Sequence, residues 1–414
     1  MTEGPDSRGV RPALLVVLAG VSAALHVGKL PPAIPVLRET LGVTLVEAGF
    51  LLSLVQFAGM TLGLAVGLAA DGLGLRRCMV VGLIVLSAAS LLGGWAHDAA
   101  TLLVLRAAEG FGVLVATVPA PSLIRQLVPA RGLAVMLGLW GTYMPFGAAL
   151  ALLIGPAFIA AWGWPAWWWL LSAPSFVMAL WLLRAVPADG VRRRQASASA
   201  GARSAPLPGW PQRLRQTLAA PGPWLVAGCF AVYSSQWLAV VGFLPSIYAQ
   251  AGFSGAATGA LTALAAAINM VGNVASGRLL QRQAPAPALL AIGYIVMTAG
   301  TIAAFAAWHG ASLPPLLRYL AVLLFSMVGG VIPGTLFSLA VRLAPSEHAV
   351  STTIGWVQQL SSLGQFLGPP LVGWVAGRAG GWQWTWAVCG GCSLLGLLMA
   401  GRIARLLRTP AHAH

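Results

Sequence analysis

Long apolar stretches recur along the whole chain and are separated by short segments rich in Gly, Pro and charged residues. Most of these stretches have about 20 residues or more, and a helix that rises about 1.5 Å per residue then crosses a hydrocarbon core of about 30 Å. The alternating ten-residue pattern of a transmembrane strand is absent from the sequence. Because a membrane interior admits only helices and closed barrels, the pattern predicts a bundle of membrane-spanning helices.

Gly, Pro and charged residues divide the apolar stretches into twelve expected spans in two sets of six. The first set is expected near residues 13–35, 46–70, 78–96, 101–125, 132–160 and 164–186, and the second near 223–249, 256–280, 287–308, 313–342, 349–376 and 384–407. A polar, basic segment rich in Ser, Ala and Pro lies between the sets. We therefore expect an all-α membrane protein with an N-terminal bundle (1–186), a connector (187–222) and a C-terminal bundle with a short tail (223–414).

Composition supports a membrane protein and argues against a soluble one. Of the 414 residues 58% are hydrophobic and only 8% are charged, against about 25% charged residues in soluble domains. The net charge of +15 does not indicate nucleic-acid binding, because the arginines form short clusters between apolar spans and not one basic face. The four cysteines lie in or beside apolar spans, where packing is the expected role.

The distribution of basic residues predicts the orientation of the spans. With the amino terminus placed in the cytoplasm, 19 of the 24 Lys and Arg residues fall in cytoplasmic segments, only Arg38 and Arg378 fall outside, and three lie within spans. This asymmetry follows the positive-inside rule and places both termini in the cytoplasm of a bacterial-type inner membrane, which requires an even number of spans. The residues before the first span contain Arg8 and Arg11 but no small-residue cleavage site, so we expect an uncleaved first helix.

The two halves share a weak internal repeat. Arg106 in the fourth span corresponds to Arg318 in the tenth, and Gly155-Pro156 followed by several Trp residues corresponds to Gly368-Pro369 followed by several Trp residues. Repeats of this kind are common in secondary transporters, which pack two halves around a central site. We expect the Trp residues to form mainly an interfacial belt.

The segment after the second span carries a loop motif, with Gly67, Asp71, Gly74, Arg76 and Arg77 in the order Gly-x3-Asp-x2-Gly-x-Arg-Arg. It resembles the signature loop of the major facilitator superfamily, although Leu75 stands where a basic residue is usual. The resemblance implies twelve helices in two pseudo-symmetric bundles, and it implies a conformational, gating role for these five residues.

Two further motifs extend the resemblance over most of the chain. Arg106-Ala-Ala-Glu109-Gly110 is similar to the family's fourth-helix arginine motif, and Gly364 to Gly373 is similar to its glycine-proline motif. Short strings such as Pro31 to Pro35 and Phe243 to Tyr248 are similar to the bacterial cyanate and nitroimidazole transporter branch.

Placing an ionisable side chain inside the membrane costs free energy, so each such residue is expected to have a structural or functional role. Lys29 is the only lysine and follows His26 by one turn, and Arg106 and Glu109 have the same spacing on the fourth span. The resemblance implies that the first, fourth, seventh and tenth helices line the central cavity. We expect Lys29, Arg106 and His26 to bind substrate and Glu109 to couple transport to protons; the alternative is a structural network in which Glu109 neutralises Arg106 and Lys29 reaches the outer surface.

Tyr233 and Gln236 lie one turn apart on the seventh span and are further candidate substrate contacts, although hydrogen bonding between helices explains them equally well. Arg318 is either a second anion contact or a residue that extends to the outer surface. The glutamines of the eleventh span, Gln358, Gln359 and Gln365, are expected to join helices and not to bind solute.

The sequence thus predicts a secondary active transporter that moves a small, anionic solute by alternating access with proton coupling. Drug or hydrophobic-compound efflux by the same fold is the alternative, followed by a non-transport membrane sensor. No nucleotide motif, catalytic cluster or metal-ligand pattern occurs in the sequence, so we expect no enzyme activity, no cofactor and no metal. The expected partners are the solute, protons and the lipid bilayer, without nucleic acid, and we expect a monomer.

Overall fold

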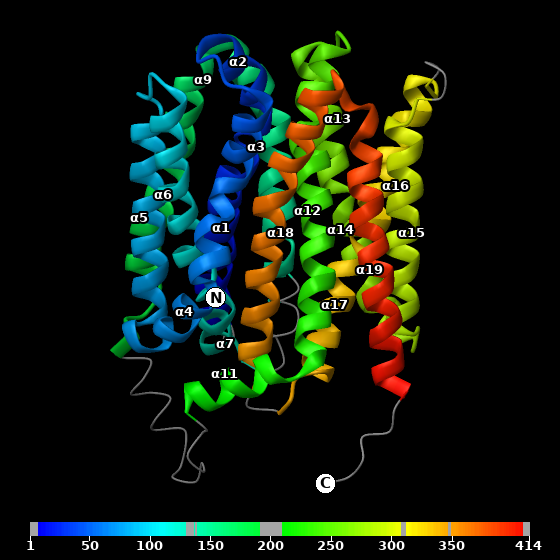
Figure 1. The fold of residues 1–414 in the computed structure, drawn as a ribbon. Helices are drawn as coiled ribbons and strands as arrows, with labels where there is room; N and C mark the ends of the chain where they lie inside the picture. The colour runs from blue at the N-terminus through cyan, green and yellow to red at the C-terminus, as the bar shows by residue number, and fades with distance from the viewer. Residues whose placement is uncertain are drawn as a thin grey trace, which may run out of the picture.

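The computed structural model describes residues 7–129, 136, 139–190, 209–307, 312–346 and 349–408, with the side chains of 7–11, 67–72 and 351 outside the description. Regular structure in these ranges is helical (Figure 1). Gly67 and Asp71, which the sequence assigned to gating, and Arg131, Arg192, Arg193, Arg194 and Arg203 lie at positions whose side chains are not described.

The N-terminal bundle contains the first six predicted spans. They consist of α1 (Ser7–Gly28), η1 (Pro31–Ala33) and α2 (Ile34–Thr40); α3 (Leu45–Ser53), η2 (Leu54–Gln56) and α4 (Phe57–Leu73); α5 (Leu75–Gly93); α6 (Ala99–Thr117) and α7 (Ala120–Leu127); and α9 (Tyr143–Ala185), which forms two spans. Within α9, Gly163 has φ 80° and ψ 164°, so the helix is interrupted there and the chain reverses between the fifth and sixth spans.

The C-terminal bundle repeats this organisation after α11 (Trp210–Ala219), a short helix within the connector. Its spans are α12 (Pro221–Gln250); α13 (Gly255–Ala267) and α14 (Asn269–Gln281); α15 (Ala286–Phe305); α16 (Pro315–Gly329) and α17 (Val331–Arg342); α18 (Val350–Ala379); and η4 (Trp382–Trp384) with α19 (Thr385–Arg408). Figure 1 shows α2 at one end of the molecule and α11 across the other, and we refer to these as the α2 end and the α11 end.

The structure confirms the twelve-helix architecture. Length and composition identify 10 candidate membrane spans among the described residues, and one of them, Leu139–Ala185, contains the interruption at Gly163 and counts as two. The twelfth is α18, which is 30 residues long but carries three glutamines and is therefore less apolar.

Local sequence signals explain where several helices begin and end. Thr44 and Glu47 form a capping box at the start of α3, Asp98 accepts from the Thr101 backbone N–H at the start of α6, and Ser254 caps α13. Gly380 ends α18 in the left-handed conformation, with φ 69°, that glycine adopts without steric cost.

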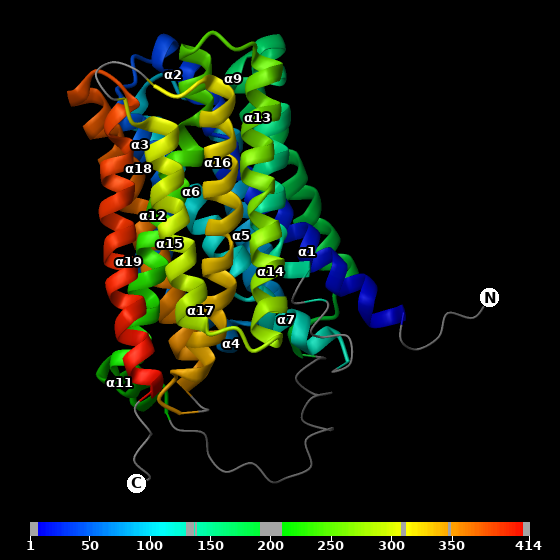
Figure 2. The same ribbon diagram turned by 90° about the vertical axis from the view of Figure 1, so that its right-hand side faces the viewer.

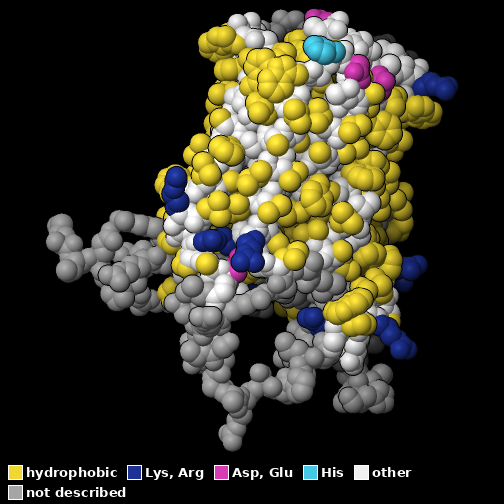
Figure 3. Space-filling model, turned by 90° about the vertical axis from the view of Figure 1, so that its left-hand side faces the viewer, with side chains coloured by type: hydrophobic (Ala, Val, Ile, Leu, Met, Phe, Trp, Pro, Cys, Tyr) yellow, Lys and Arg dark blue, Asp and Glu magenta, His cyan; other side chains and the backbone are white. Residues whose placement is uncertain are grey.

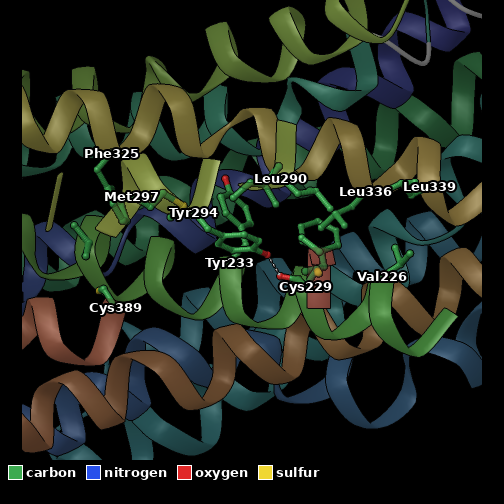
Figure 4. Close-up of a cluster of buried hydrophobic side chains, with 14 of the residues drawn as sticks. Val226, Cys229, Tyr233, Leu290, Tyr294, Met297, Phe325, Leu336, Leu339 and Cys389 are labelled. Atoms are coloured by element: carbon green, nitrogen blue, oxygen red, sulfur yellow. Dashed lines mark hydrogen bonds between the residues drawn. The ribbon is translucent and has the colours of Figure 1, made fainter. Parts of the chain in front are cut away.

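Each bundle has its own hydrophobic core. One large cluster draws only on residues of the C-terminal bundle, including Tyr233, Tyr294 and Cys229, and Figure 4 shows the Tyr294 hydroxyl donating to the Cys229 carbonyl inside it. Another large cluster draws only on the N-terminal bundle. Two further clusters draw on residues of both halves, for example Leu51 with Phe243 and Leu152 with Val241, so apolar side chains also pack between the bundles.

The outer flank of the molecule is apolar. Figure 3 shows a flank covered mainly by hydrophobic side chains, with most of the visible acidic side chains and the His near the α2 end. Large hydrophobic side chains are also exposed on helices of both bundles, among them Val104, Trp162 and Leu316. In a membrane-spanning bundle this surface contacts lipid, so its exposure is expected.

Two of the seams between the bundles each use one of the repeated glycine-proline motifs. At the first seam a Cβ atom on Gly49 of α3 would lie 2.6 Å from the Pro370 Cα of α18; at the second, a Cβ on Gly259 of α13 would lie 2.8 Å from the Leu153 carbonyl oxygen and 3.3 Å from Pro156 of α9. The internal repeat read from the sequence therefore corresponds to two related helix-helix contacts between the halves (Figure 2).

Candidate functional site

Four ionisable side chains meet inside the N-terminal bundle. His26 lies in the last turn of α1 and Lys29 directly follows that helix, whereas Arg106 and Glu109 come from α6. His26 and Lys29 have no exposed surface, and Arg106 and Glu109 are each 1% exposed. The (i, i+3) spacings of the sequence therefore place both pairs on facing sides of adjacent helices.

Glu109 connects the two cations. Its Oε2 accepts a hydrogen bond from Arg106 Nη1 at 2.7 Å, and its Oε1 accepts one from Lys29 Nζ. One carboxylate therefore pairs with both a guanidinium and an ammonium group.

Lys29 makes further polar contacts inside the bundle. Besides Glu109, its Nζ contacts Ser90 Oγ of α5 at 2.9 Å and His26 Nδ1 at 3.5 Å. The ammonium group also lies 4.6 Å from the centre of the Trp168 ring, a distance at which the ring face attracts a cation. The lysine is thus held within the bundle and does not extend to the outer surface, which was the alternative interpretation of the sequence.

Arg106 contacts the backbone of two other helices. Its Nε donates to the Leu51 carbonyl of α3 at 3.1 Å, and its Nη1 donates to the His26 carbonyl of α1 at 2.6 Å. Its Nη2 is buried and has no hydrogen-bond partner among the described residues. With His26 neutral, the cluster contains two cations and one carboxylate, and the two N–H groups of Arg106 Nη2 have no acceptor among the described residues.

The sixth span completes the site. Trp167 Nε1 donates to the Lys29 carbonyl at 3.0 Å, Ser90 Oγ donates to the Trp168 carbonyl at 2.9 Å, and His26 Nε2 lies 3.0 Å from Ser175 Oγ. These contacts fix the lysine, its serine partner and the histidine ring relative to the second half of α9.

Sequence reasoning missed these contributors from the third and sixth spans. It also placed the tryptophans mainly at the membrane interface, and for Trp167 and Trp168, each 1% exposed, this expectation was wrong. A serine or tryptophan within an apolar span carries no signal of its own. Only the packing of α5 and α9 against α1 brings these residues to the charged groups.

A glycine explains how α6 comes close enough to the second span. A Cβ atom on Gly110 would lie 2.5 Å from the Val55 carbonyl oxygen of η2, so the backbones meet without an intervening side chain. Gly110 follows Glu109 directly, and the close approach places Arg106, one turn earlier, beside the Leu51 carbonyl.

Tyr233 and Gln236 make their hydrogen bonds inside the C-terminal bundle. The Tyr233 hydroxyl accepts from Asn269 Nδ2 of α14 at 3.0 Å, and Gln236 Oε1 accepts from Ser393 Oγ of α19 at 3.1 Å. The structure therefore does not join them to the charge cluster. Their contacts are the helix-to-helix hydrogen bonds that the sequence left as the alternative.

Arg318 of α16 donates from Nε to the Ala304 carbonyl of α15 at 2.6 Å. This contact joins two helices near the α2 end and is not connected to Lys29 or Arg106 by the hydrogen bonds of the described residues. The positional correspondence of Arg318 with Arg106 thus does not extend to a matching charge cluster.

The signature loop is held by a residue that sequence analysis did not single out. Asp189 Oδ1 accepts from the Arg76 N–H at 3.0 Å and Asp189 Oδ2 accepts from the Arg77 N–H at 3.2 Å, while Arg76 Nη1 donates to the Val186 carbonyl at 2.6 Å. Gly74 has φ 105°, and a Cβ there would lie 2.6 Å from Asp189 Oδ2. The loop therefore joins the start of α5 to the segment that follows the sixth span.

The sequence profile of the Major Facilitator Superfamily matches residues 13–360. The chain belongs to this superfamily. It is 24% identical over 398 residues to the cyanate transport protein CynX of Escherichia coli (strain K12), covering 93% of this chain and 95% of CynX. It is also 30% identical over 190 residues to the puromycin resistance protein pur8 of Streptomyces alboniger, a match that spans 45% of this chain but only 37% of pur8.

Solved structures agree on the fold of this superfamily member. The partially occluded, inward-open form of the xylose transporter XylE from E. coli superposes with a TM-score of 0.76, covering 99% of this chain and 100% of XylE at 14% identity. The superposition shows the major facilitator fold, and together with the family match it makes the chain a multi-pass membrane transporter, as the signature loop indicated.

Proposed function

We propose that this transporter moves a small anionic solute together with a proton, using the buried Lys29, Arg106, Glu109 and His26 cluster as its charge-handling site. The observation that carries the proposal is the excess of one positive charge in a cluster whose four side chains are at most 1% exposed. The likeness of the whole chain to a cyanate transport protein supports a small anion as the solute.

A buried charge without a counter-ion is costly in an apolar bundle. Lys29 and Arg106 share one carboxylate, and Arg106 Nη2 has no partner among the described residues. An anion that reached this site would find both excess positive charge and a free donor. Charge balance therefore favours an anion over a neutral or cationic solute.

Protonation of Glu109 would release both cations from their shared partner. One proton and one monovalent anion together leave the net charge of the cluster unchanged, so the two enter at the lowest electrostatic cost when they enter together. When the anion leaves, ionised Glu109 can pair with Lys29 and Arg106 again. Coupled movement in the same direction follows from this exchange of partners.

The proposed setting is a bacterial-type inner membrane with the α11 end in the cytoplasm. Arg213 and Arg215 of α11, together with Arg282 and Arg342 at the ends of α14 and α17, lie at this end of the spans, consistent with the positive-inside rule. The two bundles then rock about the seams, and Gly67, Asp71, Gly74, Arg76 and Arg77 contribute to the gate on that side.

A second candidate function is the export of hydrophobic compounds, and one observation favours it. The relative with 30% identity over part of the chain is a puromycin resistance protein. An exporter of such compounds has less need for the buried excess charge, which is why we place anion transport first.

The test is uptake into proteoliposomes with an imposed pH gradient. A thermal-shift screen of purified protein against cyanate, small carboxylates, nitroimidazoles and puromycin first identifies a ligand, because binding to the folded state raises the unfolding temperature. Lys29→Ala and Arg106→Ala are then expected to abolish uptake of the anion found. Glu109→Gln is expected to retain exchange of that anion between equal pools but to lose its dependence on the pH gradient.

Glu39→Gln, a change in an exposed carboxylate of α2, serves as the matched control and should transport normally. Wild-type uptake by Lys29→Ala or Arg106→Ala protein would refute the anion site. If puromycin were the one screened compound that stabilised the protein, and if all three cluster variants transported it as the wild type does, the results would favour export of hydrophobic compounds. The charge cluster would then have a purely structural role.

A further inference from the structure

The seam between the second and eleventh spans has different contacts at its two ends. At the α2 end, backbone meets backbone: a Cβ atom on Gly49 would lie 2.6 Å from Pro370 Cα, and one on Gly373 would lie 2.5 Å from the Leu45 carbonyl oxygen. Both glycines are buried. At both glycines the nearest atoms across the seam belong to the backbone of the other helix.

In the middle of the seam the contacts involve short polar side chains. A Cβ atom on Gly59 would lie 2.6 Å from Ser362 Oγ, and that hydroxyl donates to Gln56 Oε1 at 3.4 Å. Phe366 of α18 lies against Phe50 and Phe57 of the second span, with ring centroids 6.1 and 5.7 Å apart.

Toward the α11 end, Gln359 forms two hydrogen bonds across the part of the seam that the structure describes. The Gln359 amide of α18 donates from Nε2 to the Met60 carbonyl at 2.8 Å and accepts at Oε1 from the Leu64 N–H at 3.2 Å. Met60 and Leu64 are four residues apart in α4, and an α-helix joins the carbonyl and N–H of such a pair. Gln359 of the C-terminal bundle therefore bonds to both the carbonyl and the N–H group that can pair in one backbone hydrogen bond of α4 in the N-terminal bundle.

Gly63 of α4 faces this glutamine: a Cβ atom at Gly63 would lie 3.8 Å from the Gln359 Cβ, an ordinary van der Waals distance. Gln359 is also only half-buried. When the contact breaks, Met60 and Leu64 can satisfy each other within α4 and the amide can bond to water. Separation therefore leaves neither the Gln359 amide nor the two backbone groups of α4 unpaired.

We propose that Gln359 is a gating residue: its amide holds the α11 end of the seam closed, and release of its two hydrogen bonds to α4 permits the bundles to separate at that end while the Gly49 and Gly373 contacts remain. The residue positions the two bundles and does not need to touch the solute. The inference concerns the conformational equilibrium and is independent of which solute is carried.

The experiment measures distances between the bundles in the full-length protein without solute. Pairs of nitroxide labels are placed in a background in which the four native cysteines are changed to Ala, and distances are obtained by pulsed electron paramagnetic resonance. One pair replaces the exposed residues Arg125 and Arg282 at the α11 end, and a second replaces Glu39 and Phe253 at the α2 end.

Gln359→Leu removes both hydrogen bonds at similar volume and is expected to raise the ratio of long to short distances at the α11 end about tenfold. Gln359→Asn, whose shorter amide cannot contact Met60 and Leu64 together, should raise the ratio less. Gln358→Leu is the matched control, because Gln358 is adjacent but exposed, and should leave both pairs unchanged.

Unchanged α11-end distances in monodisperse Gln359→Leu and Gln359→Asn proteins would overturn the proposal, as would an equal change in Gln358→Leu. Separation of the α2-end pair in the same direction would also overturn it, because the whole seam would then have opened. Since no solute is present, failure of this test is distinct from failure of the anion site.

Discussion

Glu109→Gln is the variant that most directly tests the charge arrangement of the buried cluster. The change preserves the size and shape of the side chain but removes the one negative charge that Lys29 and Arg106 share. The cluster then contains two cations without a carboxylate, both in side chains at most 1% exposed. Leaving a buried charge without its partner costs about 3–5 kcal/mol.

The same reasoning predicts the stability of two further variants relative to Glu109→Gln. Lys29→Met leaves the Arg106–Glu109 pair neutral and removes hydrogen bonds to Ser90 and His26, at a cost of about 1–3 kcal/mol. The double variant Lys29→Met/Glu109→Gln leaves only one unpaired cation. We therefore expect Glu109→Gln to be the least stable of the three and the second change to restore part of the loss.

Thermal unfolding of the detergent-solubilised protein, followed by the fluorescence of its 17 tryptophans, measures this order. One kcal/mol corresponds to about 2–4 °C for units of 150–250 residues, so Glu109→Gln should lower the unfolding temperature by on the order of 10 °C. Glu39→Gln, in an exposed carboxylate, should change it by no more than about 1 °C. The reasoning is refuted if Glu109→Gln and the wild type have the same unfolding temperature, or if the double variant unfolds at a lower temperature than Glu109→Gln.

Two further predictions concern carboxylates outside the cluster. Asp189→Ala should increase amide hydrogen exchange at Arg76 and Arg77 and lower the stability by about 0.5–2 kcal/mol, because these two N–H groups lose the carboxylate that accepts from them. Asp189→Asn should retain most of the protection, and equal exchange in the wild type and both variants would contradict a capping role for Asp189. The hydrogen bond from the Thr101 backbone holds the pKa of Asp98 below its usual value, so this carboxylate stabilises the start of α6 above its unfolded pKa of about 3.9 and loses that effect as the pH falls through its folded value. The hydrogen-exchange protection factor of Thr101, which corrects for the pH dependence of the intrinsic rate, should fall on acidification in the wild type but not in Asp98→Asn, and an identical pH response in the two proteins would count against this cap.

Much of the fold could be predicted because the membrane restricts the options. Each span had to be a helix of sufficient length, and the predicted ranges agree with the observed helices within a few residues for most spans, including α5 and α12. The signature loop at Gly74, Arg76 and Arg77 led to the correct superfamily. The interruption at Gly163 could be placed because apolar runs on either side were each long enough to span.

The candidate site could be predicted only in part. Ionisable residues in apolar spans are rare, so His26, Lys29, Arg106 and Glu109 stood out, and their spacing placed each pair on one helix face. Tyr233 and Gln236 were selected for polarity and position alone, and they bond to Asn269 and Ser393 within their own bundle.

The sequence by itself determined which segments cross the membrane, how many there are, and which charged groups have to be compensated inside it. The tertiary structure decided what compensates them: Ser90, Trp167, Trp168 and Ser175 surround the cluster, Asp189 caps α5, and Gln359 bonds to α4 across the seam. The physical reason is that the cost of a charge in an apolar span is a local property of the chain. Hydrogen-bond partners, by contrast, are chosen by the packing of helices that lie far apart in the sequence.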